Sequence, residues 1–157
     1  MSTSAEQRLK ELGVTLPAPP KPLGAYVEAV QVGKLLFLSG TLPVEGGTPQ
    51  FLGRLGSELS VEDGRKAARL AALNALALAK QKLGSLDEVT RVVRLTVTLV
   101  TTPEFRDHAN VADGASELLA SVFGADKAST RMVAGVVSLP RGVCVVVEII
   151  LTVNTGE

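Results

Sequence analysis

The sequence predicts an α+β fold, a mixed sheet of about six strands with two long helices on one face. Helical and β-branched stretches follow one another in the order ββ(β)αβαββ, which is typical of this class. With 157 residues the chain suits one domain with a substantial core. Hydrophobic residues make up 46% of it and charged residues 20%, so disorder over most of its length is excluded.

The N-terminal part predicts a helix followed by an extended connector. A capping-box pattern beginning at Ser4 predicts a short helix at about residues 5–12. Four prolines then fall within residues 16–23, where proline favours extended backbone. We therefore distinguish this N-terminal segment, residues 1–22, from a main domain at residues 23–157.

The next strands are predicted where β-branched and aromatic residues gather between glycines or prolines. They are Tyr26–Val32, Lys34–Ser39, a short run at Phe51–Gly53, and Val92–Val100. The third lies in a glycine-rich stretch that has neither the spacing of a P-loop nor that of a dinucleotide-binding turn. We expect this stretch to be a plain connecting loop.

Two long helices are predicted between and after these strands. The first, at residues 61–83, follows a second capping box at Ser60 and stops before Gly84. Its many alanines permit a close approach to a sheet. The second, at about residues 103–123, has Pro103 in its first turn, where a missing N–H costs no hydrogen bond.

The C-terminal part predicts a β-hairpin. Two β-branched runs, Met132–Leu139 and Val143–Val153, are separated by Pro140-Arg141-Gly142, which favours a turn. Both faces of the hairpin are apolar, although one solvated face would give alternating apolar and polar residues. Since two helices can cover one face, we expect the other to be buried against further copies in an obligate homo-oligomer.

Charge, cysteine content and hydropathy exclude or disfavour several classes of partner and of site. Sixteen basic residues balance sixteen acidic ones with no basic run, so nucleic acid is disfavoured as a main partner. Cys144 is the single cysteine, which excludes an intrachain disulfide and argues against a cysteine metal site. No apolar run approaches the length of a membrane span and the N-terminus is too charged for a signal peptide. We expect a soluble cytoplasmic protein.

Two isolated charges in the apolar hairpin, Arg131 and Glu148, are the first candidates for a functional site. By itself, Arg131 is most simply a strand-end arginine bonded to a loop carbonyl. Glu148 could equally pair with Arg94 or Arg141 as a structural bridge. In a regular hairpin Arg131 and Glu148 would point to opposite faces, so a joint site requires a bulge or a neighbouring subunit.

Several sequence features together resemble the RidA/YjgF family, whose members also carry the names translation inhibitor and L-PSP endoribonuclease. They are Tyr26 in GAYVEAV, Ser39-Gly40 in LFLSG, the helix at 61–83, the GSLDEV turn, Phe105, and Arg131 followed by SLPRG and VEI. The resemblance covers roughly residues 20–155, and the longer loop with FLGRLGSELS resembles a variant branch of the family.

This resemblance implies a chorismate-mutase-like fold, assembled as a trimeric barrel with three clefts between subunits. In members of the family, the active site in such a cleft hydrolyses enamines and imines of 2-amino acids to 2-keto acids and ammonia. It uses no metal or organic cofactor. The arginine that corresponds to Arg131 grips the substrate carboxylate, for which a guanidinium is well shaped. The substrate-binding residues implied are Arg131, Tyr26, Ser39, Gly40 and Asp113, with Glu148 as the catalytic carboxylate.

The sequence departs from the family pattern at the hydrolytic group. Val146 occupies the position of the water-positioning glutamate, and Glu148 lies two residues further on. Valine cannot hold or deprotonate a water molecule. Asp113 stands where an asparagine is expected, and Val133 where a cysteine is common. Two alternatives to the enzyme therefore stay open: a non-catalytic metabolite-binding or regulatory protein, and, more weakly, an endoribonuclease.

Overall fold

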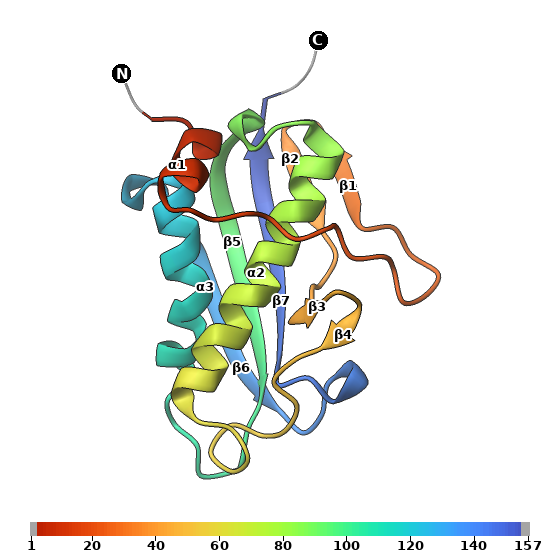
Figure 1. Cartoon of the computed structure of the whole chain (residues 1–157), viewed down its shortest axis with the longest axis vertical. Coiled ribbons are helices and arrows are strands. Elements are labelled where there is room, and N and C mark those ends of the chain that lie inside the picture. Colours follow the sequence, from red (N-terminus) through yellow and green to blue (C-terminus); the bar gives the residue numbers. More distant parts are fainter. Residues whose placement is uncertain (1–2, 155–157) are drawn as a thin grey trace.

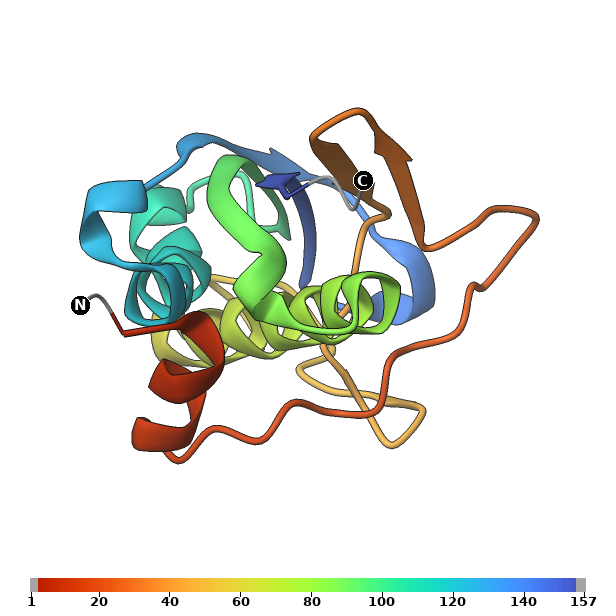
Figure 2. The same cartoon turned by 90° about the horizontal axis from the view of Figure 1, so that it is seen from above.

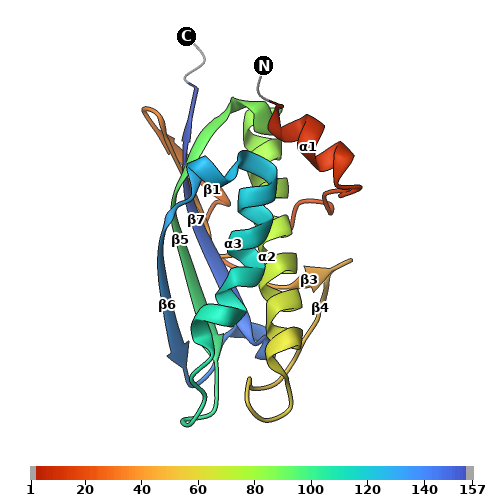
Figure 3. The same ribbon diagram turned by 90° about the vertical axis from the view of Figure 1, so that its left-hand side faces the viewer.

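The computed structural model describes residues 3–154 and places the helices on one face of a five-stranded sheet (Figures 1 and 3). The helices are α1 (Ala5–Glu11), α2 (Val61–Leu83) and α3 (His108–Phe123), with short 3-10 turns η1 (Leu86–Glu88), η2 (Ala125–Lys127) and η3 (Pro140–Gly142). The strands are β1 (Ala29–Val32), β2 (Leu35–Leu38), β3 (Val44–Glu45), β4 (Thr48–Pro49), β5 (Val89–Val100), β6 (Thr130–Val136) and β7 (Val145–Val153). The main sheet has the order β1-β2-β7-β5-β6, and β3 and β4 form a separate pair. The predicted α+β fold is confirmed.

The ends of α2 are set by capping residues next to them in the sequence. The Ser60 side chain accepts a hydrogen bond from the Asp63 N–H, the reciprocal bond is also present, and α2 ends at Gly84 with a φ of 86°. The predicted start of α3 is wrong by five residues, since this helix begins at His108. Before it the chain forms a turn closed by a hydrogen bond from the Phe105 N–H to the Thr102 carbonyl, and Phe105 is buried in the core.

The predicted hairpin is wrong. β6 and β7 do not pair with each other, because β5 lies between them, parallel to β6 and antiparallel to β7. The chain leaves β5, crosses the sheet through α3 and returns as β6, and a crossover of this kind produces parallel neighbours. The segment at Pro140–Gly142 then carries the chain past the end of β5 and forms a 3-10 turn, with Arg141 at a φ of 59°.

The glycine-rich loop also differs from its prediction. The expected strand at Phe51–Gly53 is reduced to one bridge, from Leu52 to Val143. The pairing occurs earlier, where β3 and β4 are joined by Gly46 and Gly47 at positive φ values of 58° and 83°. A two-residue glycine turn matches the twist of a tight hairpin, which is why the strands form there.

The sheet has one face under the helices and one open face, seen edge-on in Figure 3. Residues of β2, β5 and β7 that point toward the helices are buried and apolar, including Leu36, Leu95 and Ile149. The open face is also largely apolar, as the sequence predicts. Its large exposed apolar side chains are Val30, Val32, Leu35, Phe37 and Met132.

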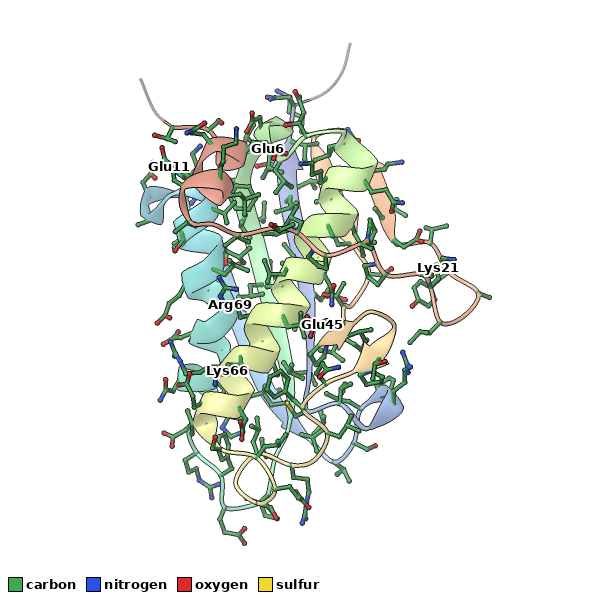
Figure 4. All side chains as sticks on the ribbon, in the orientation of Figure 1. Glu6, Glu11, Lys21, Glu45, Lys66 and Arg69 are labelled. Atoms are coloured by element: carbon green, nitrogen blue, oxygen red, sulfur yellow. The ribbon has the colours of Figure 1, made fainter. Side chains whose placement is uncertain are left out.

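The N-terminal helix is anchored on the far side of the helical layer. Glu6, labelled in Figure 4, accepts hydrogen bonds from Lys80 Nζ and from the Leu86 N–H, each at 3.0 Å. Leu9 is buried and joins the main core. From α1 the proline-rich segment crosses the outer side of α2 before it reaches β1 (Figures 1 and 2). We call residues 16–23 of this segment the strap.

Candidate functional site

Arg131 lies on β6, an edge strand of the sheet. It is level with Leu95 on β5, which in turn is level with Ile149 on β7, so its side chain points to the helical side. There its Nη1 donates to Asp113 Oδ1 at 2.6 Å and to Ser116 Oγ at 3.0 Å, both on α3. The Arg131 side chain is 25% exposed and borders a small cavity of about 160 Å³. Within residues 3–154 its Nη2 and Nε have no hydrogen-bond partner, so one edge of the guanidinium remains available.

Tyr26, Ser39 and Gly40 lie together near the opposite edge of the sheet, in the wall of a larger cavity of about 410 Å³. The hydroxyl of Tyr26 accepts a hydrogen bond from the Leu23 N–H at 3.0 Å. Ser39 Oγ donates to the Val27 carbonyl at 2.6 Å. These bonds fix the start of β1 against the end of β2 and give the wall a defined shape.

Gly40 lies against Val146 of β7. A Cβ on Gly40 would lie 2.9 Å from Val146 Cγ1, so the two positions are in direct contact. Thr41 and Val147 exchange backbone hydrogen bonds at 2.8 and 2.9 Å, which hold the Ser39–Thr41 segment beside β7. The side chain of residue 146 therefore contacts the Ser39-Gly40 segment from the open face of the sheet.

Glu148 is exposed on the open face, level with Thr96 and Met132. No basic side chain in the described part of the chain lies within ion-pair distance of it, so the expected alternative of a bridge to Arg94 or Arg141 is wrong. Arg131 and Glu148 point to opposite faces of the sheet, as strand alternation predicts. Within one chain they do not form a joint site.

The predicted site residues thus fall in three places. Arg131 and Asp113 are in contact at the β6 edge, Glu148 is on the open face, and the remaining three residues line the large cavity near β1 and β2. Sequence reasoning misses Asn74 and Arg141, which line the same cavity. For Asn74 a signal exists, because it is a polar residue within the alanine-rich surface of α2.

Burial makes Cys144 an unreactive thiol. It is fully buried, and desolvation raises its pKa from 9.0 to about 12. We expect the native protein to resist alkylation by iodoacetamide at about pH 8, because the thiolate is the reacting species. Mass spectrometry should show one added group after unfolding in guanidinium, and native labelling at the rate of a free thiol would contradict this.

The same shift has a defined effect on stability. An unfolded thiol releases its proton above its ordinary pKa of 9.0, whereas the folded thiol retains its proton up to about 12. The unfolded state therefore binds fewer protons across this window, and the free energy of unfolding should fall as the pH rises through it.

Residues 3–154 contain neither a cluster of metal-binding side chains nor a membrane-spanning helix. No group of three or more histidine, cysteine, aspartate or glutamate side chains is placed to hold a metal ion there. None of the helices in this range has the length and apolar character needed to cross a membrane.

Comparison with known proteins gives consistent matches over nearly the whole chain. Residues 6–151 match the family described as "YjgF/chorismate mutase-like, putative endoribonuclease". Protein TCP17 of Trypanosoma cruzi is 40% identical over 147 residues, which are 93% of this chain and 92% of that protein.

Solved structures show the same fold. Protein Atu1372 from Agrobacterium tumefaciens superposes with a TM-score of 0.88 at 37% identity, covering 96% of this chain and 92% of that one. TdcF from Escherichia coli, crystallised with bound serine, superposes with a TM-score of 0.63 at 25% identity, covering 90% of this chain and 96% of that one.

Proposed function

Because this chain belongs to the YjgF/chorismate-mutase-like family, we propose that it binds small carboxylate metabolites in clefts between copies of itself, arranged as a ring of three. The proposed ligands are 2-keto or 2-imino acids. Arg131 of one copy binds the carboxylate, and Tyr26, Ser39 and Gly40 of the next copy form the facing wall.

The observation that carries this proposal is the separation of the two halves of the site. Arg131 lies on β6 and the Ser39-Gly40 wall lies beyond β2, at opposite ends of the strand order. One chain cannot bring them to the same ligand. A head-to-tail interface between the β6 edge of one copy and the β1–β2 edge of the next would do so, and repeated contacts of this kind close into a ring.

The exposed apolar face supports the same assembly. Five large apolar side chains of β1, β2 and β6 are between 37% and 62% exposed on the open face. Four of them are neighbours on the paired strands β1 and β2, and an exposed apolar cluster of this kind is typical of a protein–protein interface. Burying these faces against one another in the centre of the ring removes them from water.

The chemistry of Arg131 suits a carboxylate. The Nη2 and Nε edge, left without a partner in the described residues, can form two parallel hydrogen bonds with a carboxylate. TdcF, a structural neighbour, binds serine, a small amino acid with a carboxylate. Binding of this ligand class is therefore consistent with the family as well as with the arginine.

We propose binding, rather than rapid turnover, as the main activity. Hydrolysis of an imine requires a group that positions and deprotonates water, and Val146 supplies none beside Gly40. On β7, the carboxylate nearest to Val146 in the sequence is Glu148. It remains the predicted catalytic carboxylate for any hydrolysis. Ribonuclease activity has less support, since His108 is the sole histidine and RNA cleavage by acid–base chemistry uses two groups.

The ion pair with Asp113 gives a direct test. The Asp113→Asn variant removes a carboxylate that competes with the ligand for Arg131 while keeping a similar shape. Because pairs with this exposure are worth well under 1.4 kcal/mol, we expect pyruvate to bind about two- to fivefold more tightly. Isothermal titration calorimetry measures the change.

The control is Glu117→Gln, which removes a second α3 carboxylate that is paired with Arg65 rather than Arg131. It should leave the affinity for pyruvate unchanged. Equal affinities in the Asp113→Asn variant and the unmodified protein, or an equal gain in both variants, would count against Arg131 as the carboxylate-binding group.

A further inference from the structure

The large cavity beside Tyr26 has the strap as one of its walls, and we call it the strap pocket. It lies between the strap, the second half of α2 and the turn that joins β3 to β4. Figures 1 and 2 both show the strap passing outside α2. The volume of about 410 Å³ is within the range of small-molecule sites, roughly 300–1,000 Å³, and a three-carbon acid would leave most of it unfilled.

The walls of the strap pocket are predominantly apolar and rich in proline. All four prolines of the strap line it, together with Leu42 and Leu78. Proline fixes its φ angle, so this wall needs little further ordering when a ligand enters. The hydrogen bond from the Leu23 N–H to the Tyr26 hydroxyl fastens the end of the strap. A preformed apolar wall favours an apolar group.

One nearly buried polar side chain, that of Asn74, lines this apolar space. Asn74 is 2% exposed, and its Nδ2 donates to the carbonyls of Leu42 and Val44 at 2.9 and 3.0 Å. No donor within residues 3–154 contacts its Oδ1. Since no fully buried side-chain oxygen in that range lacks a partner, Oδ1 keeps a small accessible surface, and Asn74 lines the pocket. The pocket therefore offers a hydrogen-bond acceptor in an apolar setting.

The mouth of the strap pocket is continuous with the proposed carboxylate site. Tyr26, Ser39 and Gly40 line the pocket and also form the wall assigned above to the cleft between copies. Two cations, Arg141 and Lys21, and one carboxylate, Glu28, line it as well, which leaves an excess of positive charge. Figure 4 places Lys21 near the outer bend of the strap. Positive charge at the entrance favours an anionic ligand.

We propose that the strap pocket receives the side chain of the carboxylate ligand and makes the site selective for aromatic 2-keto or 2-imino acids whose ring carries a hydrogen-bond donor. The inference rests on the proposed carboxylate binding for the head of the ligand. It adds that the ring lies against the strap prolines and that its donor meets Asn74 Oδ1.

Calorimetry with three acids that share one head group tests this selectivity. Phenylpyruvate should bind about tenfold or more tightly than pyruvate, because burying a phenyl ring contributes at least this much. 4-Hydroxyphenylpyruvate should bind more tightly still, because its hydroxyl can donate to Asn74. Equal affinity for pyruvate and phenylpyruvate would overturn the inference and leave the proposed function intact, whereas binding of none of the acids would overturn both.

A variant that fills the strap pocket tests whether the ring of the ligand binds there. Val44 is half-buried and lines the strap pocket, so Val44→Trp should occupy the space meant for the ring. We expect the preference for phenylpyruvate to disappear while pyruvate binds as before. Leu12→Trp, at an exposed site outside this pocket, is the matched control and should keep the preference. An unchanged preference in Val44→Trp would contradict a ring site beneath the strap.

Discussion

Replacing Val146 with glutamate is expected to increase the rate of imine hydrolysis by about 10²- to 10⁴-fold, the usual contribution of a positioned general base. Val146 is half-buried on the open side of β7 and in contact with Gly40. A carboxylate there would face the Ser39-Gly40 wall, where the reacting carbon of a bound imine lies in the proposed cleft. Release of pyruvate from 2-aminoacrylate generated in the assay gives the rate.

The matched control for this gain is Thr98→Glu. Thr98 is the direct neighbour of Val146 on β5, faces the same side of the sheet and is equally half-buried, yet it has no contact with Gly40. A carboxylate at residue 98 should leave hydrolysis at the level of the unmodified protein. If the two glutamate variants increase the rate equally, or if neither does, Val146 is not the residue that limits turnover.

Replacing Arg131 with alanine is expected to weaken carboxylate binding by about 10²-fold or more. Truncating one partner of a partly buried, hydrogen-bonded charge pair costs about 2–5 kcal/mol, and the ligand carboxylate would lose both of its strongest hydrogen bonds. The change in stability should be small by comparison, because Asp113 is 44% exposed and can be solvated once its partner is gone.

Arg94→Ala is the control for this loss. Arg94 is also a β-strand arginine of the main sheet, but it is level with Ile150 and so points to the open face. It should keep its affinity for pyruvate. Calorimetry gives the affinities and thermal unfolding gives the stabilities. An equal loss of affinity in both variants would indicate a general electrostatic effect and would contradict specific binding of the carboxylate by Arg131.

The parts of the fold that depend on local sequence could be predicted. The bounds of α2 follow from the Ser60 capping box and from Gly84, both within a few residues of the helix ends they set. The hairpin could not be predicted, because which strands pair depends on the path of the chain through α3. Turn residues such as Pro140 and Gly142 are compatible with a hairpin and with the 3-10 turn that occurs.

The candidate site, like the fold, could be predicted only in part. Arg131 and Ser39 could be identified because they stand out from their apolar surroundings or match a motif. The contact between Arg131 and Asp113 joins a strand to a helix and could not be read from spacing. The role of the strap was also hidden, since a proline-rich segment predicts extended backbone and says nothing of what that backbone covers.

The cleft between copies makes a prediction about mixed assemblies. Arg131→Ala lacks the carboxylate grip, and Ser39→Phe fills the facing wall, so neither variant alone should bind pyruvate. If each site takes Arg131 from one copy and Ser39 from the next, rings reassembled from equal amounts of the two variants contain some intact sites. By random assembly of a head-to-tail ring, about one quarter of the sites should be intact.

Counting pyruvate sites per chain in such a reassembled mixture, by calorimetry at constant total protein, is the most direct measurement of the central claim. We predict recovery of about one quarter of the sites of the unmodified protein, with its affinity. Recovery of no sites, together with intact rings of mixed composition in native mass spectrometry, would contradict a cleft shared between copies and would place the whole site within one chain.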